Sequence, residues 1–139
     1  MVDALRRAAR WAKPAPGCII DLRPADVAAL VEVGMRDGTV VAAGGLVVDT
    51  ERRERHAAAD AALRAVLARR VLSLVDEEEF PFFRYPDSIG ELRDYIAATW
   101  QHSRVDEATC RRVGELQRAD VGVRLWLREQ VAIRRLARD

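Results

Sequence analysis

Two residue pairs in the sequence have the chemistry of a functional site, and the first is His56 with Asp60. They lie four residues apart in a segment with helical periodicity, so both fall on one side of that helix. A carboxylate placed in this way can orient an imidazole for general-base catalysis. The simpler interpretation is a solvent-exposed pair that stabilises the helix by a few tenths of a kcal/mol. Because no nucleophile is placed nearby by the sequence, we assign no catalytic residue and keep this pair as an alternative.

The second pair is Asp21 and Arg23, which end a short apolar segment, Cys18–Leu22. A helix, a proline-glycine turn and this segment follow one another, as in the second half of a parallel α/β repeat. Apolar residues of this segment fall on both faces of a strand, since Ile19 and Ile20 are neighbours and point to opposite sides. This pattern predicts a strand that is buried on both faces. Ligands of open α/β sheets bind beyond the carboxyl ends of the parallel strands. We therefore predict that Asp21 and Arg23 form the binding site, if the chain has a polar one.

Metal binding and disulfide formation are not predicted. The two histidines, His56 and His102, and the two cysteines, Cys18 and Cys110, do not have metal-ligand spacing. Cys18 lies in the predicted buried strand and Cys110 on a predicted helix, so we expect two buried free thiols in a reducing compartment.

The composition is that of a soluble globular protein, and 139 residues predict a single domain over 1–139. The 23 basic and 22 acidic residues give a net charge of +1, which provides no long-range field for nucleic acid. No apolar run approaches the ~20 residues of a membrane span. Arg6, Arg7 and Arg10 stand where a signal peptide would have an apolar core. We expect a cytoplasmic protein that binds neither nucleic acid nor a membrane.

The clearest structural pattern is the alternation from Gly122 to Arg134. One face is apolar and the other basic around Trp126, which predicts a long strand in the middle of a small sheet. The apolar face is expected to hold Val123, Leu125, Leu127, Val131 and Ile133.

The remaining segments complete an α/β fold with α+β-like character. We predict a small mixed sheet with a long antiparallel C-terminal strand pair, an inserted β-hairpin and four or so helices. The hairpin has strands 30–35 and 39–43 around Asp37-Gly38, a pair favoured in tight primed turns. Helices are predicted over 2–12 and 50–72, from Ser88 with Glu91 as a capping box, and from Asp106 with a hydrophobic staple between Val105 and Cys110.

The segment 71–85 is predicted to be a strand with an acidic middle, Asp76 to Glu79. If it lies antiparallel to 123–134, these acids face Arg124, Arg128 or Arg134 across the sheet, and we favour such ion pairs over an acidic binding strip. Six of the eight aromatic residues lie between Leu72 and Trp100, and we expect them in the core because each buries a large area.

Several of these segments resemble the C-terminal half of class I S-adenosylmethionine-dependent methyltransferases. In that family a helix rich in Leu, Arg and Ala enters a Lys-Pro-Gly-Gly turn and then the apolar fifth strand. Here the helix from Leu5 is followed by Lys13-Pro14 and by Gly17-Cys18-Ile19-Ile20, with Ala15-Pro16 as a departure. The Tyr85-Pro86-Asp87-Ser88 turn, Glu91-Leu92 and Trp100 are similar to the region after the family's penultimate strand.

The resemblance implies that the chain holds only the fifth, sixth and seventh strands. The family's glycine-rich cofactor loop and its acidic partner would precede Met1, and no G-x-G motif occurs in the sequence. We therefore expect the chain to bind no cofactor by itself. It would bind S-adenosylmethionine only if another chain completed the site.

Three functions follow. The first is a non-catalytic, self-associating interaction protein or small-ligand-binding protein. The second is one half of a split methyltransferase with a cofactor-binding partner chain, and the third is an unrelated α+β enzyme that uses His56 and Asp60. We prefer the first and expect a homodimer, because the strand at 18–22 lacks the neighbour it has in the family. Its interface would include residues 18–22 or the 30–43 hairpin.

Overall fold

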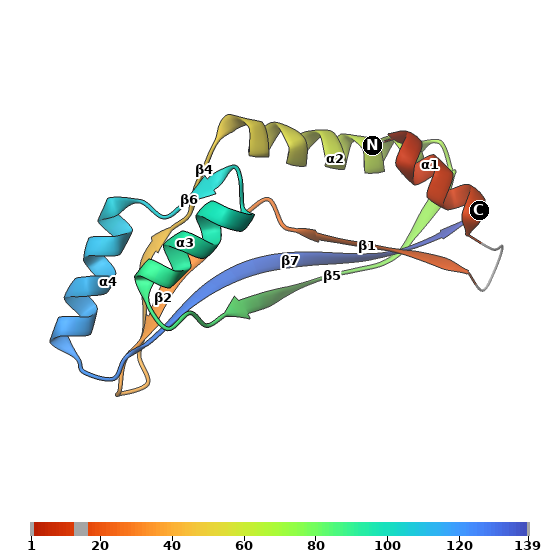
Figure 1. The fold of residues 1–139 in the computed structure, drawn as a ribbon. Coiled ribbons are helices and arrows are strands. Elements are labelled where there is room, and N and C mark those ends of the chain that lie inside the picture. Colours follow the sequence, from red (N-terminus) through yellow and green to blue (C-terminus); the bar gives the residue numbers. More distant parts are fainter. Residues whose placement is uncertain (1, 13–16, 139) are drawn as a thin grey trace. The chain divides into compact units, whose positions relative to one another are not determined.

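The computed structural model describes residues 2–12 and 17–138, which form four helices and seven strands in antiparallel sheets (Figure 1). The expected α/β class, inserted hairpin and long antiparallel C-terminal strand are confirmed. In chain order the elements are α1 (Val2–Trp11), β1 (Cys18–Pro24), β2 (Leu30–Gly34), β3 (Val40–Gly45), β4 (Val47–Val48), α2 (Thr50–Ala68), β5 (Leu72–Arg84), α3 (Ile89–Thr99), β6 (Ser103–Arg104), α4 (Glu107–Ala119) and β7 (Arg124–Arg138). The predicted turn at 13–16 lies outside the described residues. No described helix is both long enough and apolar enough to cross a membrane.

Strand β7 is the central strand of the main sheet, as predicted. Its residues 131–137 pair antiparallel with β1, and its residues 124–128 pair antiparallel with β2. Strand β5 also pairs with β7, and β3 pairs with β2. The path β1-β7-β2-β3 leaves β1 and β3 as its terminal strands. Strands β4 and β6 form a separate two-stranded sheet.

The chain divides into two compact units. The first unit comprises the chain up to Asp26, Arg53–Phe80 and the chain from Val131, and the second comprises Val27–Arg52 and Pro81–Gln130. Elements α2, β5 and β7 contribute residues to both units. The single domain over 1–139 stays a prediction.

In the first unit, α1 and α2 lie on the same face of the strands (Figure 1). The core beneath them consists of Ala9, Leu63, Val66, Leu72 and Leu136. Helix α2 is capped by Asp49, whose carboxylate accepts a 2.9 Å hydrogen bond from the amide of Arg52. No described helix of this unit lies over the opposite face of these strands (Figure 1).

The predicted burial of β1 on both faces is wrong. Ile20 and Leu22 are 53% and 57% exposed, while Ile19 on the other face packs against the core. Cys18 is also exposed rather than buried, and Cys110 is half-buried; both thiols are free. Strand β1 differs from the prediction because helices cover only one of its faces and it is the last strand of the sheet.

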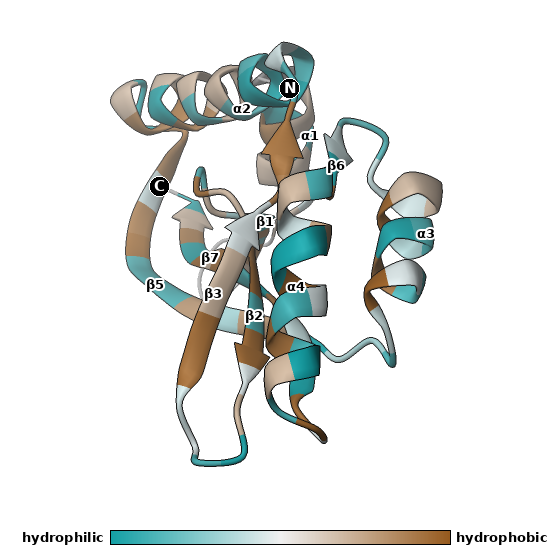
Figure 2. Cartoon of the chain, turned by 90° about the vertical axis from the view of Figure 1, so that its left-hand side faces the viewer, coloured by the Kyte–Doolittle hydropathy of each residue, from teal (hydrophilic) through white to brown (hydrophobic). Residues whose placement is uncertain are grey.

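In the second unit, α3 and α4 pack on strands β2, β3 and β7. The core includes Val31, Val33, Leu125 and Leu127 from the strands, and Leu92, Ile96, Val113 and Leu116 from the helices. Figure 2 shows the corresponding pattern, with largely hydrophobic strands β2 and β3 beside a helix α4 that alternates between hydrophobic and hydrophilic residues. The expected staple residues Val105 and Cys110 both belong to this core.

The capping box at α3 is confirmed in part. The Ser88 hydroxyl accepts a 3.1 Å hydrogen bond from the amide of Glu91, as predicted. The Glu91 carboxylate, however, accepts from the amide of Asp87 rather than that of Ser88. The cap therefore includes one residue more than the standard box.

The hairpin between β2 and β3 has a different turn from the predicted one. The amide of Met35 donates to the carbonyl of Thr39, and the amide of Gly38 donates to the carbonyl of Met35. Of the turn residues only Gly38 has a positive φ, at 88°. A primed two-residue turn of the Asn-Gly type needs two residues with positive φ, so this is a three-residue loop in which glycine supplies the single left-handed position.

The alternation predicted along β7 does not continue through its whole length. Leu125, Leu127 and Val131 are buried at odd positions, but the next buried residues are Ala132 and Leu136 at even positions. Ile133, predicted on the buried face, is only partly buried. The change of parity falls at the boundary between the two units, where β7 passes from one core to the other.

The aromatic residues of β5, together with Tyr85 directly after it, are the largest departure from expectation. Phe80, Phe82, Phe83 and Tyr85 are between 37% and 68% exposed, so they are not core residues. Tyr95 and Trp100 do pack against the core of the second unit. Strand β5 pairs with β7 alone, and only its first residue, Leu72, is buried.

Helix α2 ends in a Schellman motif with an arginine at its left-handed position. The amide of Arg70 donates to the carbonyl of Leu67, and the amide of Val71 donates to that of Val66. Arg70 has a φ of 51°, a conformation that side chains with a Cβ disfavour and that glycine adopts without strain.

We expect Arg70→Gly to stabilise the protein by about 1 kcal/mol, since it relieves the left-handed strain. Urea unfolding at neutral pH measures the change. Arg69→Gly is the matched control, because Arg69 does not have a positive φ; it should leave stability unchanged or reduce it. Equal effects of the two substitutions would contradict the assignment.

Candidate functional site

The predicted binding residues Asp21 and Arg23 are brought together, but as members of an ion-pair network. The guanidinium of Arg23 donates from Nε to Asp21 Oδ2 at 3.0 Å, and its Nη1 lies 3.1 Å from Asp60 Oδ1 on α2. Arg134 on β7 lies 3.4 Å from the same Asp21 oxygen and also binds Glu77 on β5. The network therefore joins three strands and a helix of the first unit.

The reason given for a ligand at Asp21 and Arg23 does not hold. Strand β1 pairs antiparallel with β7 along its whole length, so it is not flanked by a parallel strand whose carboxyl end would border a ligand cleft. Each of the two arginines is held by two carboxylates instead. Although burial opposes its charge, the hydrogen bonds and charges of Glu77 and Asp21 raise the pKa of Arg134. This network is suited to fixing strands to a helix, because its charges are already neutralised internally.

The alternative pair, His56 and Asp60, is not brought together. Asp60 binds Arg23, and no hydrogen bond or ion pair joins it to His56 in the described structure. A spacing of four residues places two side chains on one side of a helix, but here the Asp60 carboxylate forms its ion pair with an arginine from β1.

The acidic strip on β5 has a partner from the predicted group of arginines. Glu77 binds Arg134, whereas Arg128 binds Glu32 on the neighbouring strand β2. The expectation of acid–arginine pairs between β5 and β7 is therefore confirmed for Arg134, whereas the prediction of such a pair for Arg128 is wrong.

A buried carboxylate, Glu32, is the centre of a second polar group, which the sequence did not reveal. Only 7% of Glu32 is exposed. It accepts from Arg128 Nε at 3.0 Å and Nη2 at 2.9 Å, and from the indole Nε1 of Trp126 at 2.8 Å. The hydrogen bonds from Arg128 are the main reason that the pKa of Glu32 lies below its ordinary value; burial opposes them and Trp126 assists.

Trp126 can lie close to β2 because residue 34 is glycine. A Cβ on Gly34 would be 2.6 Å from two atoms of the indole ring. Tyr85 packs against the indole at a centroid distance of 6.2 Å, and Phe83 stacks on Tyr85 at the same distance. Period-two alternation placed Trp126 and Arg128 on one face of β7, but nothing in the sequence connected them to Glu32, which is about ninety residues away.

A third group surrounds Arg52 at the start of α2. Its Nη1 donates to the Ser103 hydroxyl at 2.8 Å, its Nη2 lies 3.6 Å from Glu129 Oε1, and its guanidinium lies over the ring of Trp100. Nearby, His102 Nδ1 is 2.9 Å from Asp49 Oδ2. Burial raises the pKa of Glu129, although the charge of Arg52 opposes this.

This third group contains a histidine, His102, that is oriented by a carboxylate. The sequence had suggested such a pair at His56 and Asp60. Asp49 and His102 are 53 positions apart, and they come together because β4 and β6 pair. The same carboxylate of Asp49 caps α2 through its other oxygen. The pair therefore fastens the β6 turn to the start of α2, and it lines no described pocket.

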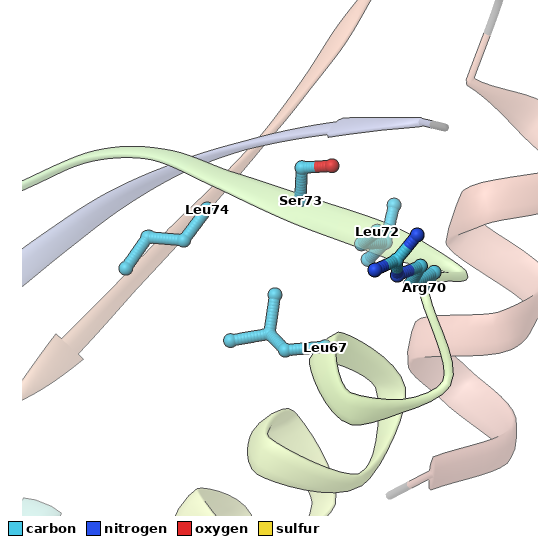
Figure 3. A pocket seen from close by; sticks show the side chains of 5 residues that line it. All are labelled: Leu67, Arg70, Leu72, Ser73 and Leu74. Atoms are coloured by element: carbon cyan, nitrogen blue, oxygen red, sulfur yellow. The ribbon is translucent and has the colours of Figure 1, made fainter.

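Two further observations concern a pocket and possible metal ligands. Figure 3 shows a pocket where α2 leads into β5, lined by Leu67, Arg70, Leu72, Ser73 and Leu74. It is lined by no carboxylate or imidazole, so its residues offer no acid–base pair. Among the described residues, no group of three or more His, Cys, Asp or Glu side chains has the geometry of a metal site.

No protein-family model, curated protein or solved structure matches the chain. The resemblance to the C-terminal half of methyltransferases therefore remains a hypothesis.

The lowered pKa of Glu32 leads to a prediction of pH dependence. A carboxyl whose pKa is lower in the folded state contributes stability above its unfolded pKa, and this is lost as the pH falls through the folded value. We expect Glu32→Gln to cost about 1 to 2 kcal/mol at pH 7, because it removes charge-assisted hydrogen bonds. The difference from wild type should shrink at pH values well below about 4.

Urea unfolding at neutral and acidic pH measures this difference. Glu54→Gln, at an exposed position on α2, is the control and should change stability little at either pH. A loss that is the same at both pH values would show that the charge of Glu32 is not its source.

Proposed function

We propose that the chain is a non-catalytic, self-associating interaction protein that binds a second copy of itself through β1. The observation that carries the proposal is the position of β1 as a terminal strand with Ile20 and Leu22 more than half exposed. A free edge strand invites pairing unless a lysine, a proline or a bulge protects it. Strand β1 has no lysine, and its only proline is its last residue, Pro24.

The charged residues of β1 do not protect the edge. Asp21 and Arg23 bind one another, and Arg23 also binds Asp60 on α2, so both are engaged towards the helix-covered face. Strand β5, which likewise pairs with β7 alone, has a contrasting sequence: four consecutive acids from Asp76 to Glu79 and then Pro81. These are features that discourage edge pairing, which leaves β1 as the more favourable contact.

A two-fold homodimer is the commonest way for a soluble chain to cover such a strand. The resemblance to methyltransferases supports the same proposal, because the family places a further strand beside the one that β1 resembles. The hairpin does not cover β1, since β2 pairs with β7 and β3.

Sedimentation velocity at micromolar concentration tests the proposal. We expect wild type to be a dimer and Ile20→Asp to be a folded monomer, because a carboxylate would be desolvated in the contact. Val121→Asp is the matched control: Val121 is 79% exposed in the turn before β7, and its substitution should leave the dimer intact. A monomeric wild type would refute the proposal.

The open edge of β1 also favours a second candidate, one half of a split methyltransferase. In that case the strand beside β1 would come from a chain that carries the cofactor loop. The arrangement of His56 and Asp60 gives no comparable support to the third candidate, an unrelated enzyme.

Calorimetry and thermal unfolding with S-adenosylmethionine and S-adenosylhomocysteine test whether the chain binds the cofactor without a partner. We expect neither compound to raise the melting temperature of the chain alone. A ligand at a hundred times its dissociation constant stabilises a protein by ~2.7 kcal/mol, which such a measurement detects. Stabilisation of the isolated chain would contradict the absence of a cofactor site.

A further inference from the structure

The uncovered sheet face of the first unit contains a groove with apolar and charged walls. Its lining residues come from three strands: Ile20 on β1, Ile133 and Arg135 on β7, and Asp76, Glu77 and Glu78 on β5. We call this the acidic groove. Ile20 is 53% exposed, and Asp76, Glu78 and Arg135 are exposed as well. Of the three carboxylates, Glu77 is paired with Arg134, and Arg135 brings one positive charge to the lining. The carboxylates still outnumber the lining arginine, so the two isoleucines offer an apolar contact next to a net negative charge.

The last turn of α1 has the complementary chemistry. Trp11, its final residue, is 86% exposed, the largest exposed fraction among the large hydrophobic side chains of the described residues. Arg7 and Arg10 are exposed as well. Arg7 lies four residues before Trp11 and three before Arg10, so its side chain neighbours both on the helix surface, and Arg10 directly precedes Trp11 in the sequence. These three residues are the basic-aromatic end of α1. Tryptophan and arginine are the residues most enriched among those that dominate protein–protein contacts.

We propose that the basic-aromatic end of α1 docks into the acidic groove of a second copy. Trp11 covers the two isoleucines, and the arginines lie beside the exposed carboxylates. This inference rests on the proposed self-association and names the segment that covers β1.

The occupant is a second copy because α1 cannot reach the groove of its own unit. Ala9 and Leu5 hold α1 on the helix-covered face of the strands, where it packs with Leu136 and Ile19. Ile20 and Ile133 belong to the opposite face, since successive residues of a strand point to opposite sides. The strands therefore separate the helix end from the groove within one copy.

A two-fold axis along the free edge of β1 makes the contact reciprocal. Such an axis turns the helix-covered face of one copy to the same side as the uncovered face of the other. Each α1 then extends across the edge onto the groove of its partner, and both contacts form in a closed dimer. Charge complementarity fixes the pairing, because positive arginines meet negative carboxylates at both contacts.

A charge exchange on the full-length chain tests this arrangement. Arg10→Glu and Glu78→Arg each place like charges together in both contacts of a homodimer, so each should raise the dimer dissociation constant at least about tenfold. An equimolar mixture of the two variants should restore dimerisation. In that heterodimer the exchanged charges meet in one contact and the native pair meets in the other. Sedimentation of each variant and of the mixture measures the three constants.

Glu79→Arg is the matched control, since Glu79 is an exposed neighbour of Glu78 that does not line the groove. It should dimerise as wild type does, whereas Trp11→Ala should weaken the dimer. Circular dichroism confirms that each variant is folded.

Two outcomes would overturn the inference. If the charge variants and Trp11→Ala dimerise normally while Ile20→Asp does not, the copies meet by edge pairing of β1, and the proposed function stands without the docking. If wild type is monomeric, both the proposed function and the docking are wrong.

Discussion

Alternation along β7 is the constraint on which the rest of the structure depends. Successive side chains of a strand point to opposite faces, so a strand that alternates regularly between apolar and polar residues contributes to a core on one face only. Strand β7 serves two cores, and its buried positions change from odd to even at residues 131 and 132. Leu125 and Leu127 thereby join the core under α3 and α4, while Leu136 joins the core under α1 and α2. Every other strand of the main sheet except β3 pairs directly with β7.

A sheet that is covered by helices on only one face leaves apolar side chains in water, and this explains where the first unit exposes them. Ile20, Leu22 and Ile133 all lie opposite the face that packs on the helices. Exposed apolar residues that are scattered singly need no explanation, but neighbouring ones on a free strand do. The cost of that exposure is removed when another surface covers the strand.

The sequence predicted well what depends on local patterns and poorly what depends on contacts between distant segments. Alternation identified β7, helical spacing identified α2, and Ser88 identified the start of α3. Burial of β1 was predicted from an apolar run, yet such a run does not say whether a layer of helices exists to cover its second face. The phenylalanines of β5 were expected in the core for the same reason. The pairs Asp49–His102 and Glu32–Arg128 join residues 53 and 96 positions apart, and no spacing rule predicts them.

Most of the ionisable residues that suggested chemistry are paired within the fold, and these pairs connect its elements. Asp21 and Arg23 hold β1 to α2, Asp49 and His102 hold the β6 turn to the start of α2, and Glu32 holds β2 to β7. A charge engaged in such a pair would have to lose its partner before it could bind a ligand, and breaking a partly buried pair costs several kcal/mol. Residues of α1, β5 and β7 differ in this respect. Arg10, Asp76 and Arg135 are exposed and form none of the ion pairs seen in the described structure, so their charges are available to a partner. The charged pairs within the fold thus fix its strands, and the exposed charges are those on which the proposed association depends.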